Sequence, residues 1–163
     1  MKKIFLLAFG FFAGFLQAQI KPEGLTAADL YAKIEQKNTP SFVVLWNPNC
    51  DIANDILARY QDIIQIYGSH IDIYTVAITN MDDLLCDMSQ QIGLNYPLYY
   101  IGGDQTISLR VRKEQFEAEF LKLIHRNETE FSQLYIHSLD QVVYDNELEI
   151  DYTKLEALLP HSS

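Results

Sequence analysis

Apolar positions along the chain switch between helical and strand-like spacing. Residues 25–36 carry them at helical spacing, and Thr26, followed three residues later by Asp29, marks the start of that helix. Residues 41–46 (Ser-Phe-Val-Val-Leu-Trp) form an apolar run rich in β-branched and aromatic side chains, which predicts a strand buried on both faces. Helical spacing returns at residues 50–67. The pattern therefore predicts a buried central strand followed directly by a long amphipathic helix.

The alternation of strand and helix continues along the next part of the chain. The predicted elements are a strand at 70–78, a helix at 81–92, strands at 98–101 and 106–111, and a helix at 113–125. Gly102, Gly103, Asp104 and Gln105 are residue types that suit a hairpin between the two later strands. Parallel strands with a helical crossover, together with this hairpin, predict an α/β fold in which helices flank a central mixed sheet.

Residues 127–163 continue beyond this alternating unit. Apolar positions at 131–139 predict a further helix, and residues 142–150 a hairpin. Asp151 is the expected N-cap of a last helix. We expect one domain at 19–126, with 127–163 as a C-terminal extension packed on it. Whether this extension only supports the core or also forms a partner surface stays open.

The first residues have the pattern of a secretory signal peptide. Lys2 and Lys3 precede an apolar run from Ile4 to Leu16, and polar residues follow. A helix of that length, about 20 Å, is shorter than the hydrocarbon core of about 30 Å. We expect a signal peptide at 1–18, no membrane span after its cleavage, and a periplasmic or secreted protein. An uncleaved anchor is the alternative, because Leu16 is larger than the small residue preferred there.

Charge and composition narrow the classes of function. Removing 18 of the 163 residues leaves 145, which suits one domain. The formal net charge is −10, and loss of Lys2 and Lys3 makes that of the mature chain −12. Such a surface repels nucleic-acid phosphates, so we expect no nucleic-acid partner. The histidines lack the spacing of a zinc site, and we expect neither a metal nor another cofactor.

Two cysteines, Cys50 and Cys86, are too few for a scaffold held together by disulfides. They pair with each other, stay free or act in thiol exchange, and their places in the fold decide among these alternatives. Cys86 lies among apolar residues of the predicted helix at 81–92, which is the setting of a small buried side chain.

Two stretches of the chain resemble the thioredoxin superfamily. Residues 43–50 (Val-Val-Leu-Trp-Asn-Pro-Asn-Cys) resemble the family's buried strand, its short loop, and the first active-site cysteine at the start of a long helix. Pro97 resembles the cis-proline that the family places opposite this cysteine, just before a hairpin strand. The resemblance implies a thioredoxin-like three-layer sandwich over about residues 25–126, in a protein of exported bacterial type.

The family's two-cysteine motif is reduced to one cysteine here, in one of two registers. If Trp46 directly precedes the motif, the motif is residues 47–50 and its first cysteine is lost. If Trp46 instead ends the strand, the motif is residues 50–53 (Cys-Asp-Ile-Ala), and Ala53 replaces the second, resolving cysteine. The spacing to the following helix and strand favours the second register.

The resemblance implies roles for several residues. Cys50 is the candidate catalytic thiolate, because backbone N–H groups at a helix N-terminus stabilise a thiolate, although the adjacent Asp51 opposes this. Cys86 is a candidate resolving cysteine if its helix packs unusually close to Cys50. The candidate partner-binding residues are Trp46, Pro48, Asn49, Tyr96 and Pro97.

The loss of one cysteine decides the expected function. A dithiol enzyme releases its substrate by attack of the second thiol, and Ala53 removes that route. We therefore expect a module that binds a protein or thiol-containing partner. The alternative is a monothiol thiol-disulfide oxidoreductase that acts through Cys50 and needs an outside thiol.

Overall fold

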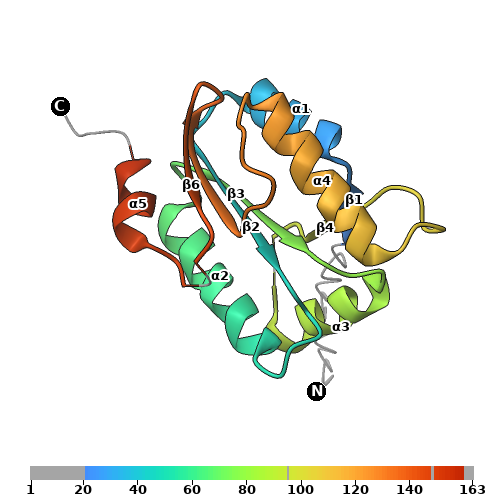
Figure 1. Cartoon of the computed structure of the whole chain (residues 1–163). Helices are drawn as coiled ribbons and strands as arrows, with labels where there is room; N and C mark the ends of the chain where they lie inside the picture. Colours follow the sequence, from blue (N-terminus) through green and yellow to red (C-terminus); the bar gives the residue numbers. More distant parts are fainter. Residues whose placement is uncertain (1–20, 95, 148, 160–163) are drawn as a thin grey trace, which may run out of the picture.

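The computed structural model describes residues 21–159, except for residues 95 and 148. The predicted signal peptide therefore lies outside the described residues. The strands are β1 (Glu23–Leu25), β2 (Ser41–Trp46), β3 (Asp72–Ala77), β4 (Tyr99–Ile101), β5 (Gln133–Ser138) and β6 (Gln141–Asp145). The helices are α1 (Ala27–Lys37), α2 (Ala53–Tyr67), α3 (Asp82–Ile92), α4 (Leu109–Leu123) and α5 (Tyr152–Ala157). Figure 1 shows these elements around one sheet.

The sheet is mixed, with strand order β1-β4-β3-β2-β5-β6. The strands β1, β4, β3 and β2 run parallel to one another, whereas β5 is antiparallel to β2 and to β6. All six residues of β2 are buried, which confirms the strand predicted from its unbroken apolar run. The carboxyl ends of the parallel strands therefore meet at one edge of the sheet.

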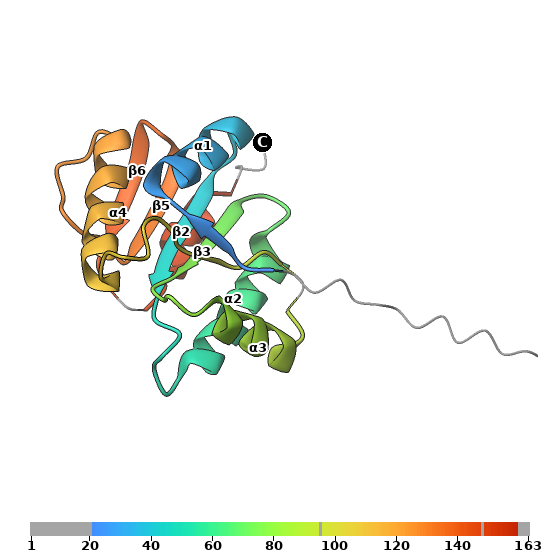
Figure 2. The ribbon, with the colours of Figure 1, turned by 90° about the vertical axis from the view of Figure 1, so that its right-hand side faces the viewer.

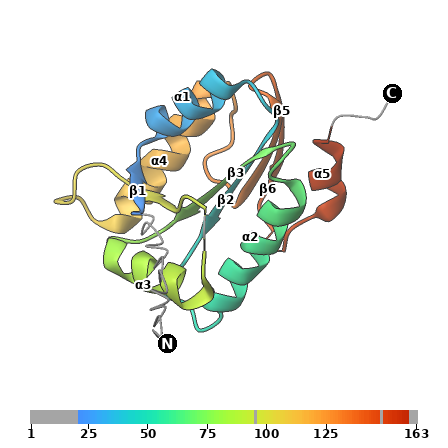
Figure 3. The same cartoon turned by 180° about the vertical axis from the view of Figure 1, so that it is seen from behind.

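Helices cover both faces of this sheet. Helices α1 and α4 pack on one face, and α2, α3 and α5 lie over the other (Figures 1 and 3). One buried cluster lies on each side of the sheet, around Phe120 and Leu134 on the α4 side and around Leu57 and Leu85 on the α2 side. The predicted α/β class with a mixed central sheet is confirmed.

Three predicted helix ends are confirmed by their hydrogen bonds. Thr26 and Asp29 form a capping box at the start of α1. Gly93 adopts a left-handed conformation (φ +66°) after α3, which glycine accepts at no steric cost. The carboxylate of Asp151 accepts N–H groups at the start of α5.

The strand predicted at 106–111 is wrong, and with it the hairpin at Gly102–Gln105. Helix α4 begins at Leu109, and the hydroxyl of Ser108 accepts the N–H of Val111 as its cap. Polar and apolar residues alternate at 106–111, but this alternation does not correspond to burial, since Val111 is 39% exposed whereas Arg112 is buried. The first buried side chain of this segment thus belongs to a helix.

The helix predicted at 131–139 is also wrong. These residues form β5, in which the consecutive residues Leu134, Tyr135 and Ile136 are all fully buried, as in a strand covered on both faces. A short apolar run fits either a buried helix or a buried strand, and pairing with β2 selects the strand. The prediction of a hairpin at 142–150 is displaced as well. The observed hairpin consists of β5 and β6 and turns at residues 139–140. Residues 133–145 thus build part of the central sheet.

Candidate functional site

The loop that follows β2 carries Cys50. It projects from the body of the molecule between β2 and α2 (Figure 2). The helix predicted from Cys50 begins at Ala53, with Ile52 as its N-cap. Cys50 is partly exposed, and its carbonyl oxygen accepts the N–H of Ala53 at 3.0 Å. The Cys50 thiol therefore lies just before the first turn of α2 rather than within it.

A short turn sets the path of this loop. The Asn47 side-chain oxygen accepts the N–H of Asn49 at 2.9 Å, which is a local turn typical of asparagine. Pro48 is buried, whereas Asn47 and Asn49 are exposed. Of the predicted binding residues in this loop, only Asn49 is thus available to contact a partner with its side chain.

Aromatic side chains form the floor beneath the loop. Trp46 and Tyr60 pack edge to face, with ring centroids 6.1 Å apart, and Tyr96 belongs to the same buried cluster. Burial raises the pKa of Tyr60, and the nearby Cys50 adds to this rise. Burial also raises the pKa of Tyr96, with a further contribution from Tyr60. Within the described residues, Trp46 Nε1 and the Tyr96 hydroxyl have no hydrogen-bond partner.

Ala53 and Cys86 are the two positions that bear on a resolving thiol. Ala53 is the first residue of α2 and is 5% exposed. Cys86 lies on α3, and both cysteines are free. Burial, reinforced by Asp82, raises the pKa of the Cys86 thiol, which makes it a poorer nucleophile at neutral pH.

The prediction of a cis-proline at Pro97 is wrong. All peptide bonds of the described residues are trans, including the bond before Pro97. Pro97 is exposed and leads into β4, which is separated from β2 by β3. The hairpin strand beside β2 is β5, and the carbonyl of Ser132, directly before it, accepts the N–H of Leu45 at 2.9 Å. No proline occupies this position.

The order and direction of the strands define the fold in which Cys50 lies. The parallel unit β2-α2-β3 lies where the sequence resemblance implied it. The antiparallel hairpin beside β2 and the final helix are instead β5-β6 and α5, which come from residues predicted to form a C-terminal extension. The fold is thioredoxin-like. Cys50 lies in it at the junction of the central strand and the long helix.

No protein-family model matches the chain, and no curated protein matches it. Among solved structures it is similar to a secreted Mycobacterium tuberculosis disulfide oxidoreductase homologous to E. coli DsbE. The identity is 11%, the coverage 74% of this chain and 79% of that chain, and the TM-score 0.45. It is also similar to a candidate thiol-disulfide oxidoreductase from Bacteroides vulgatus, at 12% identity, with 74% and 71% covered and a TM-score of 0.45.

Two exposed apolar residues near the Cys50 loop were not among the candidate site residues predicted from the sequence. Ile52 and Met81 are the N-caps of α2 and α3, and they are 58% and 55% exposed. Neither offers the side-chain oxygen that a cap normally provides to the helix N–H groups. Since β2 and β3 are adjacent and parallel, both helices begin at the same sheet edge. Apolar residues at two N-caps are the signal that points to them.

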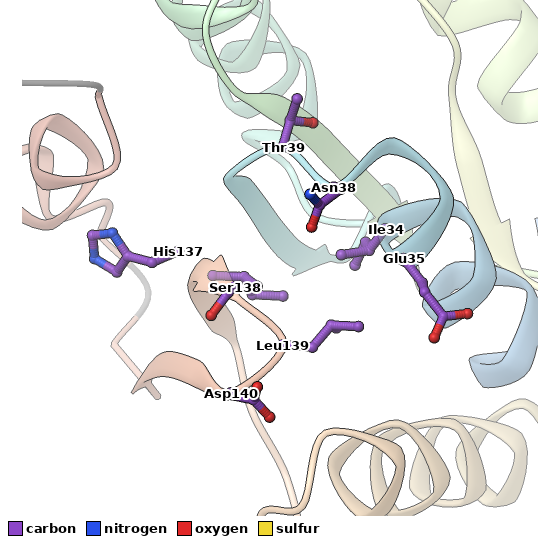
Figure 4. A pocket seen from close by; sticks show the side chains of 9 residues that line it. Ile34, Glu35, Asn38, Thr39, His137, Ser138, Leu139 and Asp140 are labelled. Atoms are coloured by element: carbon purple, nitrogen blue, oxygen red, sulfur yellow. The ribbon is translucent and has the colours of Figure 1, made fainter.

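A separate hollow lies at the opposite end of β2, between the end of α1 and the β5–β6 turn (Figure 4). The side chains of Glu35 and His137 extend away from one another there, so no catalytic group converges on it. In the described part of the chain, no three metal-ligating side chains gather, and no helix is long and apolar enough to cross a membrane.

Proposed function

We propose that this protein is a partner-binding module and that it binds an extended protein segment at the sheet edge around Cys50. This surface, named the Cys50 edge, comprises Asn49, Asp51, Ile52, Met81 and Asp83. The observation that carries the proposal is the pair of exposed apolar N-caps on neighbouring helices. Serine, threonine, aspartate or asparagine at these positions would stabilise each helix by about 1 kcal/mol. Ile52 and Met81 lack this stabilising hydrogen bond, and their side chains expose apolar surface.

The backbone at this edge suits an extended segment. The first N–H groups of a helix have no partner within the helix, and neither N-cap side chain satisfies them here. The N–H of Ala53 already donates to the Cys50 carbonyl and that of Asp83 to the Asp82 carboxylate, so a bound segment would use the remaining N–H groups of these first turns. Carbonyl oxygens of a bound segment are natural acceptors for such groups. Its apolar side chains would then contact Ile52 and Met81, so that one segment uses both features of the Cys50 edge.

The negative charge of the Cys50 edge restricts the kind of segment that would bind there. Asp51 and Asp83 are exposed beside the two N-caps, and the net charge of the chain is −10. A segment that combines apolar and basic side chains complements this surface. The side chains of Trp46, Pro48 and Tyr96 are buried, so these residues are left out of the Cys50 edge. Pro97 lies before β4 and is left out of the Cys50 edge.

The second candidate function is a monothiol thiol-disulfide oxidoreductase. The observation that favours it is the partial exposure of Cys50 directly before an uncapped helix N-terminus. The thiolate would attack a substrate disulfide, form a mixed disulfide and release one substrate thiolate. A second, external thiol would then release Cys50, since Ala53 offers no sulfur.

A binding titration tests the proposal. The probe is a capped ten-residue peptide of alternating valine, threonine and lysine, followed by NMR of the ¹⁵N-labelled protein. We expect the signals of residues 49–52 and 81–83 to shift, and Ile52→Lys to weaken binding at least tenfold. Ile66→Lys is the matched control, because Ile66 is 62% exposed near the other end of α2. Equal affinity of both variants, or no shift at these signals, contradicts the proposal.

A further inference from the structure

Arg112 is a buried arginine in which two of the three guanidinium nitrogens have no hydrogen-bond partner among the described residues. It lies in the first turns of α4 and is only 3% exposed. Its Nη1 donates to the carbonyls of Ile101 and Gly102, at 2.9 and 3.2 Å. Within residues 21–94, 96–147 and 149–159, its Nε and Nη2 have no partner. An arginine stays charged at any pH of interest, so these groups are unpaired donors of a buried cation.

The two unused nitrogens lie on the same edge of the guanidinium. Nε and Nη2 present parallel N–H groups, which is the fork that binds both oxygens of a carboxylate. Nη1, on the other side, is held by the two backbone carbonyls and fixes the orientation of the group. Leaving such donors buried and unpaired costs about 1–3 kcal/mol or more. The unused edge therefore has the geometry of a carboxylate receptor.

A cavity of about 180 Å³ is lined in part by Arg112. The Arg112 Nε and Nη2 have almost no exposed surface, so a ligand in the cavity reaches them when a side chain of the cavity wall shifts. Its walls come from the residues that follow β1 and β4 and from α4, and they include Thr26, Gly102, Gly103, Asp104, Arg112 and Glu119. Ligands of open α/β sheets bind at the carboxyl ends of the parallel strands, which is where this cavity lies. Its volume suits a small molecule of a few heavy atoms rather than a drug-sized ligand.

The walls also carry negative charge. Asp104 and Glu119 line the same cavity, and both are exposed. The Asp104 carboxylate accepts the N–H and hydroxyl of Thr106, at 2.9 and 2.8 Å, so it is held beside the cavity rather than paired with Arg112. A simple anion would meet repulsion from these two groups. A ligand that carries an ammonium group close to its carboxylate would instead be attracted by these two groups.

We propose that this cavity binds a small zwitterion of the α-amino-acid type, with its carboxylate on the Nε–Nη2 edge of Arg112 and its ammonium towards Asp104 and Glu119. Gly103 lines the cavity without a side chain, because its φ of +96° is a conformation that most other residues avoid. The site is separate from the Cys50 edge and does not depend on partner binding there.

Three matched probes test this site by NMR of the Arg112 Nε–H signal in the full chain. Glycine carries both charges, N-acetylglycine only the carboxylate, and glycinamide only the ammonium. We expect glycine to shift the signal saturably and to bind at least tenfold more tightly than either analogue. The site is refuted if glycine leaves the signal unchanged, or if N-acetylglycine binds as tightly as glycine.

Variants test separately the residues proposed to bind the carboxylate and the ammonium of the ligand. Glu119→Gln is expected to weaken glycine binding at least threefold while leaving N-acetylglycine binding equal or stronger. Arg112→Gln is expected to abolish binding, and Arg110→Gln, a change at an 88% exposed side chain on the same helix, is the control. If Arg112→Gln does not fold, the three probes on the unchanged chain and on Glu119→Gln still test the zwitterion site. If Glu119→Gln prefers glycine over N-acetylglycine as strongly as the unchanged chain does, the zwitterion site is contradicted.

Discussion

Single buried polar side chains hold the last part of the chain on the sheet. The Gln133 amide donates to the carbonyls of Glu147 and Glu149, at 2.9 and 3.0 Å. The Tyr135 hydroxyl donates to the Gln133 side-chain oxygen at 2.6 Å and accepts the N–H of Asp151 at 3.0 Å. Because each donor or acceptor satisfies another buried group, loss of one member leaves its partner unpaired. These bonds fix α5 relative to β5.

Asp145 is the charged member of the same region. It is 7% exposed and forms an ion pair with Lys154. The hydrogen bond from Lys154, followed by the N–H of Glu147, lowers the pKa of the Asp145 carboxyl below its ordinary value of 3.8. A carboxyl whose pKa is lowered on folding stabilises the folded state above its unfolded pKa. This contribution is lost as the pH falls through the folded pKa.

Asp145→Asn is therefore expected to destabilise the protein by about 1–3 kcal/mol at pH 7. The difference from the unchanged chain should shrink as the pH falls below 3.8. Urea unfolding at pH 7, 5 and 3 measures it, with the exposed Asp140→Asn as control. A penalty that is the same at pH 3 as at pH 7 would show that the carboxylate charge does not contribute.

Among the elements, the junction of β2 and α2 bears on the register proposed for the cysteine motif. The first register pairs position 47 with Cys50, and the second pairs Cys50 with position 53. Ala53 is buried at the start of α2, whereas Asn47 is exposed before the turn. A helix that begins at residue 53 leaves Cys50 just before it, which favours the second register.

Reintroducing a cysteine tests the register directly. Ala53→Cys is expected to form a disulfide with Cys50 in air and to gain dithiol reduction of small disulfides, in a Cys86→Ser background. Asn47→Cys, the matched variant for the other register, is expected to remain a dithiol under the same conditions. Mass spectrometry after alkylation counts the free thiols. A disulfide in Asn47→Cys but not in Ala53→Cys would reverse the assignment.

Elements differed in how much of them could be predicted from sequence. Helix ends at Thr26, Gly93 and Asp151 were predictable because each depends on local chemistry within a few residues. The strand β5 was not, since its apolar run fits two structures and only pairing with β2 selects one. Pro97 was misplaced for the same reason, because sequence order does not tell which strand lies beside β2.

At the scale of the whole molecule, the carboxyl edge of the parallel strands carries both proposed sites. The Cys50 edge follows β2 and β3, and the Arg112 cavity follows β1 and β4. The sequence predicted Cys50 and its loop from their local pattern. It did not predict Met81 or Arg112 as site residues, because the first depends on adjacency of β2 and β3 and the second on burial against the end of β4.

We expect the Cys50 edge to bind a partner without redox turnover. Reduction of insulin disulfides by glutathione, followed by turbidity, tests it with the Cys86→Ser chain added in catalytic amount. We expect the same rate with this variant, with the Cys50→Ser, Cys86→Ser double variant and with glutathione alone. An acceleration that requires Cys50 would contradict the binding module and identify a monothiol oxidoreductase instead.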